Sequence, residues 1–326
     1  MSTTPLPKSS VPRVSAPPTI QKSVGKPGFF QRPQKWAPYL FLSPYLLLFL
    51  VFGAYPILKS LSLSLYATSG PRDAVFIGLG NYKFLLGDAD FRTAVWNTLV
   101  FTFWSVFLQL PASLGLALLL NQKWVRGREF FRLAFFSSNL LGQVFVGVLF
   151  GVLYQPQYGL LNKFLSSITR GAIPIDTKWL NDPSLVMPAL VMTSLWMYAG
   201  FNMIYFLAAL QAVDGDLYEA AQVDGANSVQ QFFAVTLPGI RPVATFVLVT
   251  STLGALQLFE LPYVLLSNSA GPKNAGLTIV MYLFNNGFQS GDLGYASAVG
   301  WTLALGMLVI SLIQVRLTGA ARGSAA

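Results

Sequence analysis

Residues 211–242 have the sequence QAVDGDLYEAAQVDGANSVQQFFAVTLPGIRP, a polar segment between two long apolar runs. The run before it covers residues 185–210, and the run after it covers residues 243–267. A helix needs about 20 predominantly apolar residues to cross a bilayer. Both runs are long enough, so residues 211–240 are predicted to form a loop that connects two membrane spans.

The loop carries the start and stop signals of a first short helix. Asp216 and Glu219 have the spacing of a capping box, which places a carboxylate at each end of the first turn, near its free amides. Asp224-Gly225 is a natural stop because glycine adopts the left-handed conformation that ends helices. Ala220 and Ala221 favour a helix between these signals, and their small side chains let another protein approach closely.

A second short helix is predicted to follow. Asn227 or Ser228 can cap its start. Leu237-Pro238 is predicted to end it, and Arg241-Pro242 to lead into the next span. The segment is therefore predicted to be a helix-turn-helix elbow at the membrane surface. From its residues alone, this elbow fits a docking surface for another protein and a structured connector equally well.

The composition is that of an integral membrane protein. Of the 326 residues, 54% are hydrophobic and 10% are charged, against about 25% charged in a typical soluble domain. The net charge is +9, and basic residues of membrane proteins gather in cytoplasmic loops, so nucleic-acid binding is not expected. The chain has no Cys and no His by sequence, which excludes disulfides, Cys or His metal sites and Ser-His or Cys-His nucleophile pairs. No catalytic residue and no metal site is predicted.

Six apolar runs are long enough to cross a bilayer as helices. They cover residues 37–58, 93–120, 130–154, 185–210, 243–267 and 293–317. A seventh apolar stretch, residues 277–288, contains two asparagines and is too short to span, so it predicts a short interfacial or re-entrant helix. The predicted fold class is all-α: a polytopic membrane protein with six transmembrane helices and an elbow between the fourth and the fifth.

The first 35 residues differ from the rest. They contain seven Pro, five Ser, six Lys or Arg and no acid, so residues 1–35 are predicted to form a disordered basic tail. The membrane domain covers residues 36–320. Short loops rich in basic residues favour the cytoplasmic side, and one such loop joins the second and third runs. Both termini and the elbow are therefore predicted to be cytoplasmic. The basic residues of that loop are Lys123, Arg126, Arg128 and Arg132.

Glu219-Ala220-Ala221, Gly225 and Val235-Thr236-Leu237-Pro238 resemble the cytoplasmic "EAA" loop of permease subunits in binding-protein-dependent ABC importers. The similarity extends over nearly the whole chain after residue 36. The segment Phe259-Glu260-Leu261-Pro262-Tyr263-Val264-Leu265 is similar to the first of the two paired sugar permeases, in the branch typified by maltose and glycerol-phosphate uptake. The chain departs from the family pattern outside the docking motif, at Ser137-Ser138, Val213-Asp214 and Asn268-Ser269-Ala270.

The resemblance implies that the elbow is a coupling helix that sits in a cleft on a cytoplasmic ATPase. The residues implied to couple are Glu219, Ala220, Ala221, Asp224, Gly225, Leu237 and Pro238. Glu219 either pairs with a cationic or amide group of the ATPase or caps its own helix. The sequence lacks a Gly-x-x-x-x-Gly-Lys-Ser/Thr loop. No cofactor is therefore expected on the chain itself, and ATP and Mg²⁺ are expected to bind the partner ATPase.

The implied function is import of a sugar, a mono- or oligosaccharide or a polyol, by alternating access in the cell membrane. The implied partners are a second homologous permease subunit, a dimer of cytoplasmic ATP-binding subunits and an extracytoplasmic solute-binding protein, within membrane lipid. The chain itself is then not an enzyme. A glycerol phosphate ester is the alternative substrate, although a phosphorylated ligand would favour an Arg in a span core, where the sequence has none. A secondary transporter or channel would leave the pattern at residues 219–238 unexplained.

Polar side chains inside the apolar runs are the candidates for the substrate path. They are Gln257, Glu260, Asn202, Gln143, Tyr198 and Tyr263. Amides both donate and accept hydrogen bonds, which suits sugar hydroxyls, but they serve contacts between helices equally well. Glu260 is the only acid in any run. It either faces an external vestibule, hydrogen-bonds a sugar, braces the fifth span beside Pro262 or pairs within the bundle. The two tyrosines either stack on a sugar ring or anchor their spans at the membrane interface.

Overall fold

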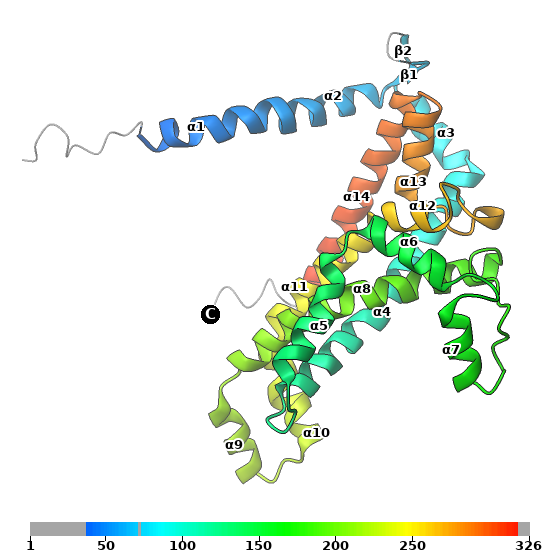
Figure 1. Cartoon of the computed structure of the whole chain (residues 1–326). Helices are drawn as coiled ribbons and strands as arrows, with labels where there is room; N and C mark the ends of the chain where they lie inside the picture. Colours follow the sequence, from blue (N-terminus) through cyan, green and yellow to red (C-terminus); the bar gives the residue numbers. More distant parts are fainter. Residues whose placement is uncertain (1–36, 71–72, 319–326) are drawn as a thin grey trace, which may run out of the picture. The chain divides into compact units, whose positions relative to one another are not determined.

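The computed structural model describes residues 37–70 and 73–318. The predicted basic tail, residues 1–35, lies outside this part of the chain. Almost all of the described secondary structure is helical (Figure 1). The chain divides into two compact units, residues 1–56 and 57–326, and each is described by itself.

The described part of the N-terminal unit is an apolar helical stretch. It contains α1 (Ala37–Phe49), a π-helical turn η2 (Leu50–Ala54) and the beginning of α2 (Tyr55–Leu63). Pro44 lies inside α1 without ending it. The helical stretch Pro38–Leu63 is long and apolar enough to cross a membrane, and none of its most apolar window is buried within the chain. A helix that is apolar all round requires an apolar environment, and a membrane provides one.

Four long apolar helices form the frame of the second unit. They are α4 (Ala89–Asn121), α8 (Pro183–Ala212), α11 (Leu237–Leu256) and α14 (Leu293–Thr318). α4 packs along α8 and α11, and α14 packs along α11. With the N-terminal span and one bent helix pair counted as a span, the described residues provide six candidate membrane spans. The prediction of an all-helical, six-span membrane protein is confirmed.

The third span is bent, where the sequence predicted one run over residues 130–154. It consists of α5 (Arg128–Leu140) and α6 (Gln143–Leu153), which meet at an angle of 100°. Each half follows a different neighbour. α5 crosses α8 so closely that a β-carbon on Gly200 would collide with the backbone carbonyl of Phe135. α6 packs on α12 (Glu260–Leu265). The two halves of the bent span therefore have different main packing partners.

The fifth predicted span, residues 243–267, also breaks. α11 ends at Leu256, and α12 begins at Glu260 after a short turn. Glu260 therefore lies beyond the break, in α12, and not on a straight continuation of α11. The turn frees backbone carbonyls, and the Thr278 hydroxyl donates a hydrogen bond of 2.7 Å to one of them, on Leu258. Pro262 lies in the first turn of α12, where a missing backbone amide costs no helical hydrogen bond.

α8 begins at a well-defined cap. The carboxylate of Asp182 accepts hydrogen bonds from the Ser184 hydroxyl at 2.7 Å and from the Ser184 backbone amide at 2.9 Å. These bonds, the hydroxyl first, hold the pKa of Asp182 below its usual value because they stabilise the charged form. Pro183 occupies the first helical position, which proline favours.

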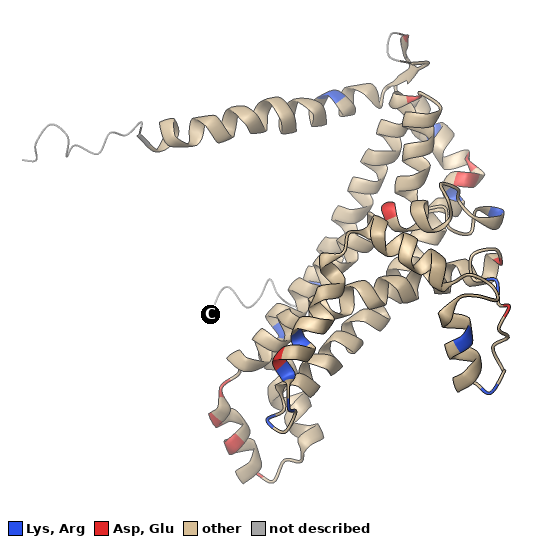
Figure 2. Ribbon diagram, in the orientation of Figure 1, with Lys and Arg blue, Asp and Glu red and all other residues tan. Residues whose placement is uncertain are grey.

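Shorter elements connect the long helices. They are β1 (Tyr66–Thr68), its antiparallel partner β2 (Ala74–Phe76), α3 (Gly80–Gly87), α7 (Leu160–Ile168), η4 (Pro272–Asn274), α13 (Ile279–Phe284) and the π turn η5 (Asn285–Gln289). The predicted short helix at residues 277–288 corresponds to α13 and η5. Figure 2 shows that the charged residues gather in connecting segments and near helix ends, while the long helices are almost free of them.

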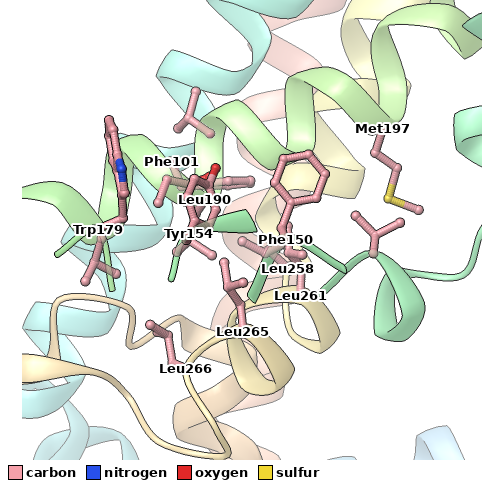
Figure 3. Packing of buried hydrophobic residues seen from close by; sticks show 14 of the residues in the cluster. Phe101, Phe150, Tyr154, Trp179, Leu190, Met197, Leu258, Leu261, Leu265 and Leu266 are labelled. Carbon is pink, nitrogen blue, oxygen red and sulfur yellow. The ribbon is translucent and has the colours of Figure 1, made fainter. Parts of the chain in front are cut away.

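One hydrophobic cluster holds the broken helices in place (Figure 3). Phe150 of α6, Leu190 of α8 and Leu261 of α12 are buried in it. The Tyr154 hydroxyl, next to this cluster's aromatic rings, donates a hydrogen bond of 2.8 Å to the Ala189 carbonyl. The cluster also includes Phe101 of α4. It therefore joins α4, α6, α8 and α12, and the first three of these helices also bound the polar cavity described below.

Candidate functional site

The elbow begins with α9 (Gly215–Val223), whose N-cap is Asp214. The Asp214 carboxylate accepts a hydrogen bond of 3.0 Å from the Asp216 amide. The predicted capping box of Asp216 and Glu219 is therefore wrong, because the chain leaves α8 in an extended conformation at Val213 and the new helix starts earlier. Asp216 lies in the first turn, where its charge still interacts favourably with the helix dipole.

α9 ends at Asp224-Gly225, as the sequence predicted. Gly225 has a φ of +81°. Its amide donates to the Gln222 carbonyl at 3.0 Å, and the Ala226 amide donates to the Ala221 carbonyl at 2.9 Å. These two bonds form a Schellman motif. A β-carbon on Gly225 would meet no atom within 4 Å, so the backbone angle and not the available space favours glycine here.

The second helical segment of the elbow is α10 (Ser228–Gln231). Asn227 caps it, which resolves the choice between Asn227 and Ser228. The Asn227 side-chain oxygen accepts hydrogen bonds from the backbone amides of Val229 and Gln230. The Asn227 backbone amide in turn donates a hydrogen bond of 2.8 Å to the Gln230 side-chain oxygen. This reciprocal pair is a complete capping box.

This helix does not end at Leu237-Pro238, which corrects the prediction. It continues through a π-helical segment, η3 (Phe232–Thr236), directly into α11. Pro238 follows the π-helical segment; it has no backbone amide to bond a carbonyl of the preceding turn, yet the helical path continues through it. Arg241-Pro242 lies inside α11, not ahead of it. The elbow and the following span are thus one connected helical path.

Two contacts tie the elbow to the ends of its flanking spans. The hydroxyls of Tyr218 on α9 and Thr236 in η3 form a hydrogen bond of 2.9 Å. Gly239 of α11 lies against Val213 at the end of α8, and a β-carbon there would lie 2.8 Å from a Val213 methyl group. α9 is thus bonded to η3, and the end of α8 packs against α11.

The elbow exposes side chains that could contact another protein. Of the residues implied to couple, Ala221 is half-buried and the others are exposed: Glu219, Ala220, Asp224, Gly225, Leu237 and Pro238. Large apolar side chains are exposed beside them, and Val223 is 88% exposed. The others of this kind are Leu217, Val229 and Phe233. Leu217 and Val223 lie on α9, ahead of the candidate span Ser228–Leu256, and exposed apolar side chains there indicate a surface that another protein can cover.

The acids of the elbow lack ionic partners within the described chain. Across residues 37–70 and 73–318, the one ion pair joins Glu129 and Arg132 at 2.7 Å. The four acids of the elbow are Asp214, Asp216, Glu219 and Asp224. An apolar surface with unpaired carboxylates can bind a groove that presents apolar and cationic groups.

A polar cavity of about 310 Å³ lies between α4, α6, α8 and α11. A chain of hydrogen bonds runs along its wall. Gln109 donates to the Ser194 carbonyl at 3.3 Å, and Asn202 donates to Gln109 Oε1 at 3.2 Å and to Ser251 Oγ at 3.1 Å. The network therefore joins α4, α8 and α11 around a lining of amides and hydroxyls.

Two buried oxygens at the cavity have no hydrogen-bond partner among the described residues. They are Ser105 Oγ and Gln143 Oε1. The Gln143 amide group donates to the Tyr198 hydroxyl at 2.9 Å, which orients the side chain and leaves its oxygen free. An unsatisfied buried polar atom is costly. A hydroxyl-rich ligand or water in the cavity could satisfy both oxygens.

The fifth span contributes two predicted residues to this region. Gln257 lines the cavity and is exposed. Glu260 is also exposed and begins α12 two residues after Leu258, which lines the cavity. Thus Gln143, Tyr198, Asn202 and Gln257 line one cavity, and Glu260 lies next to it.

Tyr263 is the predicted path residue that the structure separates from the cavity. It is not among the cavity's lining residues. Its ring contacts Phe259 and Phe284, at centroid distances of 5.2 and 5.5 Å. It belongs to the packing between α12 and α13.

Sequence reasoning did not single out four Ser and Thr residues that line the cavity: Ser105, Ser194, Thr250 and Ser251. The only feature of the sequence that could have identified them is that each is a polar residue inside an apolar run. That signal is weak because Ser and Thr in membrane helices commonly bond their own helix, as Ser113 does to the Gln109 carbonyl. In the described part of the chain, no group of three or more acids could hold a metal ion.

Comparison with known proteins finds relatives over nearly the whole chain. Residues 36–322 match the family described as "Binding-protein-dependent transport system inner membrane component". The chain is 39% identical to the arabinooligosaccharides transport system permease protein AraP of Bacillus subtilis, over 89% of this chain and 91% of that protein. It is 36% identical to the lactose transport system permease protein LacF of Rhizobium radiobacter, over 85% and 92% of the two chains.

A solved structure shares the fold. In the crystal structure of a bacterial alginate ABC transporter in complex with an alginate pentasaccharide-bound periplasmic protein, one chain matches this one with a TM-score of 0.75. The two chains are 27% identical, and the match covers 87% of this chain and 94% of the other.

Proposed function

The chain belongs to the family of inner membrane components of binding-protein-dependent transport systems, and from this membership we propose that it is the membrane-spanning subunit of an ATP-driven sugar importer. It passes a mono- or oligosaccharide, or a polyol, from an external binding protein into the cytoplasm by alternating access. The family match over residues 36–322 carries this proposal. As a transporter permease subunit, the chain is not itself catalytic.

The relatives and the cavity both favour a sugar as the substrate. The curated relatives bear the names of arabino-oligosaccharide and lactose systems, and the matched structure is that of an alginate transporter. The cavity is lined by amides and hydroxyls without any Lys or Arg. Such groups donate to and accept from sugar hydroxyls. A glycerol phosphate ester would need a cationic partner, so the sugar is the better substrate.

The elbow is the proposed attachment point of the ATPase. Its exposed apolar side chains and unpaired acids offer a docking surface, and its contacts with α8 and α11 pass a displacement to the spans. The sequence lacks the phosphate-binding loop of P-loop ATPases. ATP hydrolysis, with the nucleotide and Mg²⁺, is accordingly assigned to a dimer of partner subunits.

The remaining partners and the orientation follow the same proposal. A second homologous permease subunit completes the path, and an extracytoplasmic binding protein delivers the sugar. The short basic segment between α4 and α5, which contains Lys123 and Arg126, is placed on the cytoplasmic side. Both termini and the elbow then lie in the cytoplasm.

Copurification tests the composition of the complex. The tagged chain is expressed in its native host and purified in mild detergent, and its partners are identified by mass spectrometry. We expect an ATP-binding subunit and a second permease in fixed ratio with the chain. A chain that purifies alone and transports solute by itself would contradict the proposal.

Uptake into proteoliposomes tests the substrate. The purified complex is supplied with its binding protein and ATP, and with labelled arabino-oligosaccharides, lactose, maltose or glycerol 3-phosphate. We expect ATP-dependent uptake of at least one sugar and none of the phosphate ester. Preferred uptake of glycerol 3-phosphate would overturn the choice of a sugar.

A further inference from the structure

By sequence, a single side chain in the segments that contribute residues to the cavity is charged at neutral pH. These segments are residues 93–120, 133–162, 183–213 and 242–272. Together they contain no Lys, no Arg and no Asp, and their one Glu is Glu260. The side chains that line the cavity itself are all uncharged. Any electrostatic preference that this chain imposes on a passing solute therefore comes mainly from Glu260.

The carboxylate of Glu260 is free to act on a solute. Within the described residues it forms no hydrogen bond and no ion pair, and the side chain is exposed. Glu260 follows Gln257 and Leu258, which both line the cavity, by three and two residues. The next two residues, Leu261 and Pro262, are buried, so the backbone of Glu260 is held firmly at the start of α12. A fixed, uncompensated negative charge thus stands beside a neutral cavity.

We propose that Glu260 makes the substrate path selective by charge, so that it accepts uncharged and cationic saccharides and rejects anionic ones such as uronic acids. This inference rests on the proposed function as a sugar importer. An unpaired charge in a cleft with low-dielectric walls focuses its field and changes the local concentration of charged solutes. An anionic sugar would meet repulsion at Glu260 and no Lys or Arg on the cavity wall to offset it. A neutral sugar would lose nothing.

The field can be measured without knowing the natural substrate. The chain contains no cysteine, so one introduced cysteine is a unique reporter. Gly254 lines the cavity, and a β-carbon there would meet no atom within 4 Å. Gly254→Cys is placed in the assembled transporter, with any cysteines of the partner subunits replaced. Its rates of modification by a cationic trimethylammonium and an anionic sulfonate methanethiosulfonate reagent are then compared.

Glu260→Gln removes the charge and keeps the shape of the side chain. We expect the ratio of cationic to anionic modification rates at the reporter to fall by about tenfold in Glu260→Gln, and further in Glu260→Lys, because unit charges at this range interact appreciably in a partly dehydrated site.

Thr250→Cys, on the same wall, is the second reporter if Gly254→Cys does not assemble. Ser167→Cys, exposed on α7, is the matched control, and its ratio should not respond to Glu260→Gln. A change of less than about twofold at the cavity reporter would overturn the proposal.

A transport measurement connects the field to specificity. The sugar with the highest uptake competes with its 6-carboxylate form, in the parent transporter and in Glu260→Gln. The binding protein is the same in both, so its own preference cancels when the two uptake ratios are divided. We expect the preference for the neutral sugar to relax by about tenfold in Glu260→Gln, and an unchanged preference would overturn the assignment. If no sugar is taken up at all, the proposed function fails, while the labelling ratio still reports the field of Glu260.

Discussion

The elbow carries its determinants on consecutive residues, whereas the cavity draws its lining from helices far apart in the sequence. Asp214, Gly225 and Asn227 define the elbow within a few turns. In the cavity, by contrast, the hydrogen bond between Gln109 and Asn202 joins residues 93 positions apart. The elbow is specified by local capping rules, while the cavity exists only after the spans have packed.

The two regions also differ in how their polar groups are satisfied. The elbow's acids are exposed and have no ionic partner in the described chain, so their partner is expected on another protein. In the cavity, Gln109 and Asn202 are buried and bonded to each other. The elbow is thus an exposed surface whose acids have no ionic partner in the described chain, whereas the cavity wall is held by its own hydrogen bonds. Variants in the two regions should therefore fail in different ways.

The largest effect is expected from Gly225→Trp in the elbow. A non-glycine residue at a φ of +81° costs about 1–2 kcal/mol, and the indole would stand on the docking surface. Sugar uptake in proteoliposomes should fall by at least about tenfold, and the ATPase should no longer copurify. The subunit should still insert, because a side chain at this position meets no other atom of the chain. Unimpaired uptake would remove the main support for docking at the elbow.

The next largest effect is expected from Asn202→Leu in the cavity. The change leaves Gln109 Oε1 and Ser251 Oγ without their donor, which costs about 1–3 kcal/mol. Uptake should fall by about tenfold, while the ATPase stays bound at the parent level in pull-down measurements. Tyr263→Phe is the matched control outside the cavity and should transport normally. Loss of the ATPase in Asn202→Leu would break the distinction between the two regions.

A moderate effect is expected from Asp214→Ala. The substitution removes the N-cap of α9, worth about 1 kcal/mol of helix stability. Because only part of the elbow population then keeps its docking geometry, binding-protein-stimulated ATP hydrolysis should fall by about fivefold. Asp214→Asn, which retains a capping oxygen, should restore hydrolysis. If Asn behaves like Ala, the charge and not the cap is what matters at this position.

The smallest effect is expected from Tyr218→Phe. It deletes only the hydroxyl that bonds to Thr236 at 2.9 Å, a loss of about 0.5–1.5 kcal/mol. The link between α9 and η3 should loosen, and the amount of ATP hydrolysed per sugar imported should rise by about twofold. An unchanged ratio in the simultaneous assay of both quantities would show that the hydrogen bond does not contribute to coupling.

The sequence predicted most of the elbow because its signals are local. Gly225 as the helix stop and an Asn or Ser cap for α10 follow from backbone preferences that depend on neighbouring residues. Asp214 was missed as the first cap because Val213 was not recognised as the point where α8 ends. Pro238 was taken as a stop because its position in the first turn of a new helix depends on how η3 continues.

The cavity and the broken spans were less predictable because they depend on packing. Neither the bend between α5 and α6 nor the close approach of α5 to Gly200 is visible in the hydropathy of the sequence. Gln143 and Asn202 stood out as polar exceptions in apolar runs. Their position on one cavity, and the separation of Tyr263 from it, required the tertiary contacts.

Crosslinking from the elbow tests most directly whether this region binds the ATPase. Val223→Cys in α9 and Trp124→Cys in the basic α4–α5 segment are unique thiols, and the parent side chains are 88% and 71% exposed. Each is treated with a short thiol-to-amine crosslinker in the assembled complex, and the products are identified by mass spectrometry. The account predicts an adduct with the ATP-binding subunit from Val223→Cys and none from Trp124→Cys. No adduct from Val223→Cys, or equal adducts from both positions, would contradict it.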